Sequence, residues 1–91
     1  MGVKIRIPKV LQDKANGVTL VDVKGKTVRD CFEALIKQFP GLEGQLMDTQ
    51  GVLLLKWMLY VNHRSANYKN ELSSPVADGD LVELLPVLSG G

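Results

Sequence analysis

Two strand-like patterns occupy the first 23 residues. Residues 3–7 alternate between apolar and basic side chains, the period of two that is typical of a strand with one buried face. Pro8 disfavours further pairing, and Asn16-Gly17, a strong two-residue turn signal, leads into the β-branched and apolar residues 18–23. We expect an antiparallel hairpin with a long loop, in which either face of the second strand could be the buried one.

From Thr27 the hydrophobic period changes to that of a helix. Apolar side chains recur at i, i+3, i+4, i+7, i+8 and i+11, and polar side chains occupy the opposite face. Thr27 is the predicted N-cap, Asp30 completes an imperfect capping box, and Pro40-Gly41 stops the helix. We therefore expect one amphipathic helix. Its apolar positions are Val28, Cys31, Phe32, Leu35, Ile36 and Phe39.

The middle of the chain predicts a third strand and a shorter one. A short helical turn is expected within residues 42–50, and the apolar residues 52–62 predict the third strand. The polar stretch that follows has room for a short edge strand near Tyr68 or Leu72.

The order of these elements indicates an α+β fold. An Asp-Gly-Asp turn at residues 78–80 precedes a last strand at residues 81–85, whose outward face is marked by Glu83. If the first and last strands are parallel neighbours at the centre, this is the β-grasp (ubiquitin-like) arrangement, a mixed sheet of four to five strands with one main helix packed across it. We expect a β-grasp domain over residues 1–86 and a flexible C-terminal tail over residues 87–91, ending in Gly-Gly.

Composition and charge narrow the function classes. The 91 residues carry eleven basic and ten acidic side chains, a net charge of +1. Eight basic and five acidic groups fall in residues 1–45, against three and five in residues 46–91, a mild polarity that is expected to be solvated surface. Lys and Arg do not cluster as phosphate contacts require, so nucleic acid is not an expected partner. A chain this short builds one modest core, which argues against a self-sufficient enzyme.

Isolated reactive residue types do not form a catalytic or metal-binding motif. The single cysteine, Cys31, lies on the apolar stripe and is interpreted as a core residue, and a lone cysteine matches neither a disulfide framework nor a zinc site. His63 is interpreted as an exposed loop residue, and Trp57, Tyr60 and Tyr68 as packing residues. Without a signal peptide or an apolar run of about 20 residues, we expect a cytoplasmic location and no membrane association.

The end of the chain offers a different chemistry. Residues 87–89 lead from Pro86 to Gly90-Gly91, which would present an α-carboxylate on a slim, extended arm. Glycine lacks Cβ, so such a backbone can enter a narrow channel in another protein. Attack by the carboxylate on the α-phosphate of ATP would make an acyl adenylate that sulfur or an amine can attack. The alternative is that Gly-Gly is simply a ragged end.

The C-terminal segment resembles that of a known family. Residues 76–91 combine a D-G-D turn, an apolar strand, a proline and a final G-G, and in this they are similar to the MoaD/ThiS family of ubiquitin-like sulfur carrier proteins. The opening Val3-Lys4-Ile5-Arg6-Ile7-Pro8 and the segment Leu46-Met47-Asp48 look most like the CysO-type carriers of amino-acid biosynthesis. Molybdopterin synthase small subunits usually carry two prolines before the tail, whereas this chain has only Pro86.

The resemblance implies a sulfur carrier rather than an enzyme. An E1-like adenylating enzyme would use ATP and magnesium to activate the Gly91 carboxylate, and a sulfur donor would convert it to a thiocarboxylate. Ser89, Gly90 and Gly91 would enter partner active sites, while the chain itself would bind no cofactor. The sulfur would go to a cysteine-synthase-like enzyme making cysteine or homocysteine. The alternatives are the small subunit of molybdopterin synthase, acting with the large subunit, or a ubiquitin-like protein modifier.

A docking surface is predicted beside this tail. If Glu83 faces outward, the alternation of the last strand places Leu81 and Leu85 on the same side, and Val87 continues that side beyond the strand. Exposed apolar groups there would suit a groove in a partner, and the resemblance favours docking at Leu85 and Pro86. A strand covered by the chain's own loop is the alternative.

Overall fold

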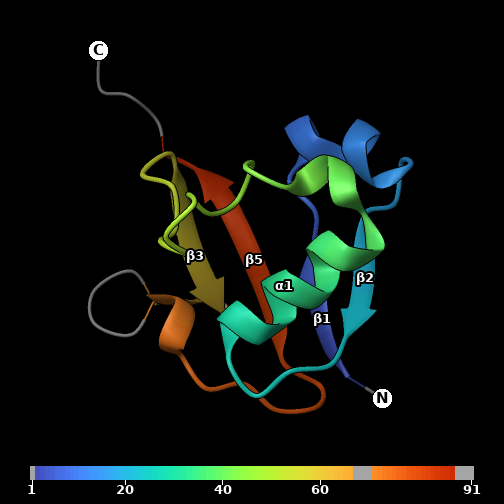
Figure 1. The fold of residues 1–91 in the computed structure, drawn as a ribbon. Helices are drawn as coiled ribbons and strands as arrows, with labels where there is room; N and C mark the ends of the chain where they lie inside the picture. The colour runs from blue at the N-terminus through green and yellow to red at the C-terminus, as the bar shows by residue number, and fades with distance from the viewer. Residues whose placement is uncertain (1, 67–70, 88–91) are drawn as a thin grey trace.

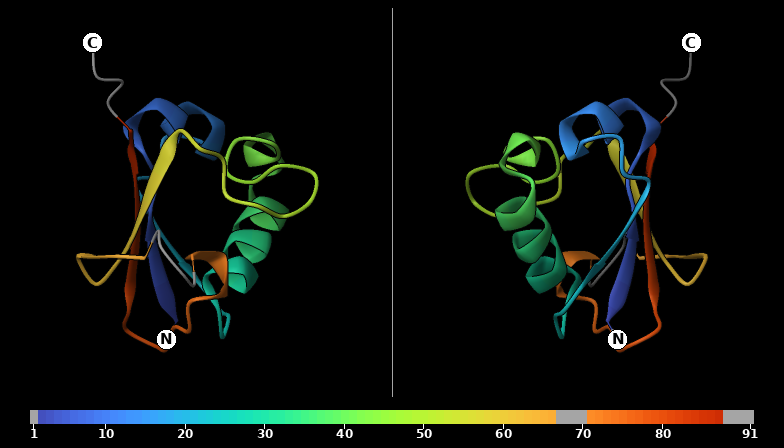
Figure 2. Two further views of the ribbon diagram at one scale, coloured as in Figure 1. Left: turned by 90° about the vertical axis from the view of Figure 1, so that its left-hand side faces the viewer. Right: turned by 90° about the vertical axis from the view of Figure 1, so that its right-hand side faces the viewer.

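The computed structural model describes residues 2–66 and 71–87, which form one five-stranded sheet and one α-helix (Figure 1). The strand order is β2-β1-β5-β3-β4, with β1 and β5 parallel and the other neighbours antiparallel. Helix α1 lies across one face of the sheet, and no helix of the described residues covers the other face, which is called the open face below (Figure 2). This is the predicted β-grasp fold. The elements are β1 (Val3–Arg6), β2 (Leu20–Val23), α1 (Val28–Gln38), β3 (Trp57–Val61), β4 (Arg64–Ser65) and β5 (Leu81–Pro86).

The predicted hairpin of β1 and β2 is confirmed, with an unexpected connection. The loop contains a 3₁₀ helix, η1 (Lys9–Ala15), and the turn at Asn16 and Gly17 adopts positive φ angles of 56° and 79°. Val21 and Val23 are buried, so they form the core-facing side of β2, which the sequence left open.

Helix α1 begins as its sequence predicts. Thr27 Oγ1 accepts a hydrogen bond from the N–H of Asp30 at 3.2 Å, which satisfies one free donor of the first turn. The Asp30 carboxylate accepts from the N–H of Lys26 at 3.2 Å, one residue before the position that a capping box uses. Phe32, on the inner side of the helix, is fully buried and belongs to the core.

The predicted edge strand near Leu72 is wrong, and Tyr68 lies outside the described residues. Leu72 is buried in a 3₁₀ helix (Glu71–Ser73), and the edge strand is β4. The reason is local: Asn62 and His63 have φ angles of 51° and 68°, so they turn the chain back onto β3 within two residues.

The helical turn expected within residues 42–50 is displaced toward the N-terminus. It is a 3₁₀ helix at Pro40–Leu42, where proline supplies the φ angle of a first helical residue. No helix among the described residues combines the length and the apolar character that spanning a membrane would demand.

Candidate functional site

Strand β5 carries the chain to the open end of the sheet. It lies between β1 and β3, so hydrogen bonds hold it on both sides, and because it is parallel to β1 it runs in the same direction and continues beyond the last β1 pair, Arg6 with Glu83, to Pro86. Trp57 of β3 is opposite Pro86, and the N–H of Val87 donates to the Lys56 carbonyl oxygen at 2.8 Å. The sheet therefore fixes the backbone up to Val87. The predicted reactive residues Ser89, Gly90 and Gly91 lie outside the described residues.

The predicted docking residues differ in how far they are exposed. Val82 and Leu84 are buried, whereas Leu85 is 49% and Val87 46% exposed, and Pro86 is exposed between them. Leu81 is only partly buried and lies about 13 Å along the strand from Leu85, given the usual rise per residue. The structure thus brings Leu85, Pro86 and Val87 together at the end of β5 and leaves Leu81 apart from them.

Glu83, between these positions, contacts Arg6 and His63 on the open face. Its carboxylate accepts from Arg6 Nε at 3.1 Å and lies 3.2 Å from Nδ1 of His63. Its side chain is consequently only 17% exposed, although it points outward as predicted. His63 is exposed, as expected, but its pairing with Glu83 was not predicted because it requires knowledge of the sheet register.

Two further exposed apolar residues border the end of β5, and sequence reasoning missed both. Leu55, which precedes β3, is 95% exposed, and Val10 of η1 is 68% exposed. Leu55 and Val87 line a hollow of about 240 Å³. The available signal was weak: each residue adjoins another apolar residue, and only the fold decides which neighbour is buried. Together with Leu85, Pro86 and Val87, they form an apolar rim around the point where the chain leaves the sheet.

Cys31 is no alternative reactive group. It is fully buried in α1, and burial, with the nearby charge of Asp30, raises its pKa from 9.0 to about 11. The thiol therefore stays protonated and inaccessible at neutral pH, as its predicted core role requires. Trp57 is also buried, and its Nε1 donates to the Gln45 carbonyl oxygen at 2.7 Å.

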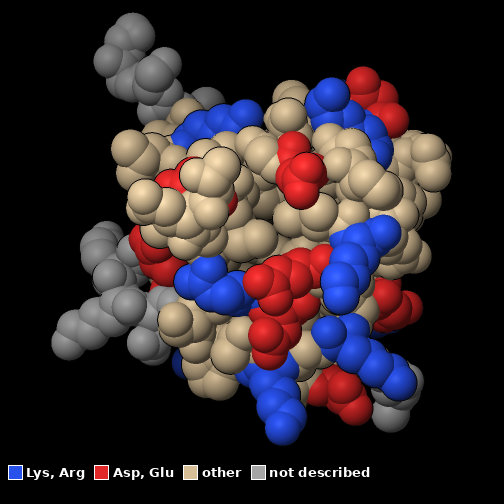
Figure 3. Space-filling model, viewed as in Figure 1, with Lys and Arg blue, Asp and Glu red and all other residues tan. Residues whose placement is uncertain are grey.

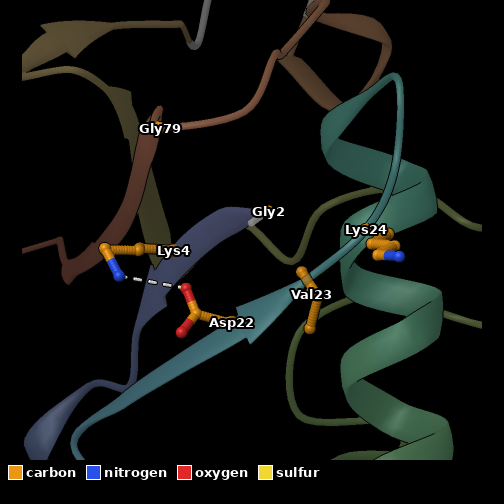
Figure 4. A pocket seen from close by; sticks show the side chains of 6 residues that line it. All are labelled: Gly2, Lys4, Asp22, Val23, Lys24 and Gly79. Carbon is orange, nitrogen blue, oxygen red and sulfur yellow. Dashed lines mark hydrogen bonds and ion pairs between the residues drawn. The ribbon is translucent and has the colours of Figure 1, made fainter.

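A second surface feature, a pocket, lies at the opposite end of the sheet, away from the apolar rim. Gly2, Lys4, Asp22, Lys24 and Gly79 are among its lining residues, and Lys4 Nζ donates to Asp22 at 3.1 Å (Figure 4). No three His, Cys, Asp or Glu side chains of the described residues are grouped to hold a metal ion.

Charges on the face covered by α1 are mixed. Basic and acidic side chains intermingle across this face, and neither sign forms a continuous patch there (Figure 3). This distribution differs from the clustered Lys and Arg that phosphate backbones require. The apolar rim at the end of β5 is therefore the feature that best fits a binding role.

Comparison with known proteins supports the predicted family resemblance independently of the structure. The sequence model of the ThiS family matches residues 5–91. The sulfur carrier protein CysO of Mycobacterium tuberculosis is 31% identical over 93 residues, which cover 100% of both chains.

Solved structures agree in fold over nearly the whole chain. The crystal structure of the Amycolatopsis orientalis BexX/CysO complex matches with a TM-score of 0.89 at 28% identity, covering 99% of this chain and 100% of the other. SAMP1 from Haloferax volcanii matches with a TM-score of 0.74 at 31% identity, covering 98% of each chain. The match to the sequence model of the ThiS family runs to residue 91 and so includes the segment that continues beyond β5.

Proposed function

This chain belongs to the ThiS family, and from that premise we propose that it is a sulfur carrier protein whose Gly91 carboxylate is activated by another enzyme. The observation that carries the proposal is the full-length similarity to CysO, which extends through residues 88–91. The exposed rim at the end of β5 supports it, because a partner that receives the tail must approach there. The chain acts as a co-substrate and catalyses no step itself.

The proposed chemistry has two steps. The Gly91 carboxylate attacks the α-phosphorus of ATP in an E1-like adenylating enzyme, forming an acyl adenylate and releasing pyrophosphate. A sulfur donor then attacks the acyl carbon and AMP leaves, so that the carboxylate becomes a thiocarboxylate. ATP and magnesium belong to the adenylating enzyme, and the carrier needs no cofactor of its own.

The length of the tail determines where partners must bind. Residues 88–91 span at most about 14 Å when fully extended. An enzyme that holds Gly91 in a recessed active site therefore has its surface close to Val87, where the sheet ends. Leu85, Pro86 and Val87 are the proposed docking residues, and Leu81 is a peripheral one.

The relatives support a proposal for the destination of the sulfur. The name of CysO and its crystal structure in complex with BexX favour transfer inside a protein partner, and we propose a cysteine-synthase-like enzyme that makes cysteine or homocysteine. A molybdopterin synthase large subunit is the alternative acceptor. The proposed site of action is the cytoplasm.

A second candidate function is supported by the similarity to SAMP1. SAMP1 stands for small archaeal modifier protein 1, and a further crystal structure of that protein from Haloferax volcanii matches this chain at 28% identity. A ubiquitin-like modifier would form the same acyl adenylate at Gly91, but a lysine amine would replace sulfur and give an isopeptide bond. The two functions share the activation step and differ in the final product.

Intact-mass spectrometry tests the proposal. The chain is incubated with the E1-like enzyme of the same organism, magnesium, ATP and sulfide. We expect a mass increase equal to the difference between a sulfur and an oxygen atom, and no increase when ATP is omitted or Gly90-Gly91 is deleted. An unchanged mass with an enzyme shown to release pyrophosphate would contradict sulfur carriage. High-mass conjugates under the same conditions would favour the modifier function.

A further inference from the structure

A groove lies beside the end of β5, on the side of η1. It has a volume of about 530 Å³, and η1 is at the same end of the sheet as the end of β5 (Figure 2). Val10 from η1 and Leu85 from β5 are its exposed apolar members. Because Pro86 also lines it, the groove begins where the tail leaves the sheet. Its other exposed lining residues are Arg6, Lys9 and Thr19.

Hydrogen bonds and core packing hold the η1 side of this groove in place. Leu11 and Ala15 anchor η1 in the core, and Gln12 Nε2 donates to the Ile7 carbonyl oxygen at 3.2 Å. The N–H of Ile7 in turn donates to the carbonyl oxygen of Thr19 at 2.9 Å. Since Leu11 points inward, its neighbour Val10 is held outward. A groove formed before binding loses little conformational entropy when a partner occupies it.

The charge of the groove selects the kind of partner. Arg6 and Lys9 line it, and no Asp or Glu among the described residues does. Arg6 is paired with Glu83, whereas Lys9 has no carboxylate of the described residues within ion-pair distance. The groove thus combines apolar walls with uncompensated positive charge. A segment with an apolar anchor and neighbouring carboxylates is complementary to it.

We propose, on the basis of the sulfur-carrier function proposed above, that this groove docks an acidic segment with an apolar anchor on the E1-like adenylating enzyme. Both the sulfur-carrier function and the modifier function begin with adenylation by that enzyme. The reach of about 14 Å for residues 88–91 brings its surface to Pro86, which is a wall of the groove. Val10 inserts beside the anchor, and Lys9 pairs with a carboxylate.

Steady-state adenylation separates docking from chemistry. Pyrophosphate release is measured against carrier concentration for the wild type, Lys9→Glu and Val10→Asp. Each substitution is expected to raise KM about 10-fold, with kcat within about two-fold, because loss of one well-packed contact costs about that much in affinity. Lys24→Glu and Val52→Asp are matched controls at exposed positions away from the groove, and they should leave KM unchanged.

Ionic strength provides a second readout that a structural defect would not reproduce. The wild-type KM should rise with salt, and Lys9→Glu should abolish or reverse that dependence, because its carboxylate repels those of the partner. Thermal unfolding of each variant verifies folding, and Lys9→Glu alone decides the question if Val10→Asp unfolds. Groove variants that behave like the two controls would overturn the docking proposal while leaving sulfur carriage intact. Absence of wild-type adenylation would overturn the proposed function, and the docking proposal with it.

Discussion

Cys31 and Gly91 are two places where this chain could hold a reactive sulfur, and substitution of Cys31 separates them. Burial raises the pKa of the thiol from 9.0 to about 11. Two pKa units correspond to about 100-fold less thiolate at neutral pH. The thiolate is the species that reacts, and Cys31 is also fully buried. We therefore expect an aromatic disulfide reagent to label native Cys31 at least about 100-fold more slowly than the unfolded chain.

The functional half of this prediction uses Cys31→Ala. The folded variant should accept as much sulfur from the adenylating enzyme and sulfide as the wild type, because no step requires the thiol. Intact mass gives the amount, and thermal unfolding confirms that the variant is folded. Native labelling within about 10-fold of the unfolded rate would refute the reasoning about burial. Loss of sulfur uptake by folded Cys31→Ala would refute the assignment of sulfur to the tail.

Four further predictions follow from the same structure. Because the folded state holds the Cys31 proton more tightly, the wild type should lose about 2 kcal/mol of stability relative to Cys31→Ala as the pH rises from about 9 to 11, measured by denaturant unfolding. Leu85→Asp should weaken binding to the adenylating enzyme about 10-fold in calorimetry and change the unfolding midpoint little, since Leu85 is half exposed. Thr27→Ala should cost about 1 kcal/mol in denaturant unfolding through the lost helix cap, and a cost near zero would contradict that cap. Asn62→Ala should raise the pKa of Asp80, which the Asn62 side chain holds below its usual value, and NMR titration of the carboxyl group would show the change.

The pH dependence of Asp80 has the opposite sign to that of Cys31. A lowered folded-state pKa gives stability above the unfolded pKa, and this stability is lost as the pH falls through the folded pKa. Removal of the Asn62 amide should therefore reduce the acid-linked change in stability. A variant whose acid unfolding matches that of the wild type would contradict the role of this hydrogen bond.

Local signals explain which elements were predictable. The turn at Asn16-Gly17 and the helix capped by Thr27 are determined within a few residues, and both are present where expected. The edge strand was misplaced because β4 is only two residues long and is created by the turn at Asn62 and His63. A polar pair with positive φ angles gives little signal without the partner strand.

The surroundings of the tail were predictable only in part. Alternation in β5 correctly indicated that Leu85 is exposed and that Glu83 points outward. The pairing of Glu83 with Arg6 joins residues 77 positions apart and depends on the parallel register. The exposure of Val10 likewise depends on the position of η1 beside β5, which the sequence pattern does not indicate.

Tandem mass spectrometry of the C-terminal peptide tests the central claim most directly. After reaction of Cys31→Ala with the E1-like enzyme, ATP, magnesium and sulfide, the account predicts one oxygen-to-sulfur exchange located on Gly91. Its thiocarboxylate should be alkylated by iodoacetamide, and the same peptide from a reaction without ATP should be unmodified. An added sulfur on any other residue, or an unmodified Gly91 after verified adenylation, would contradict the account.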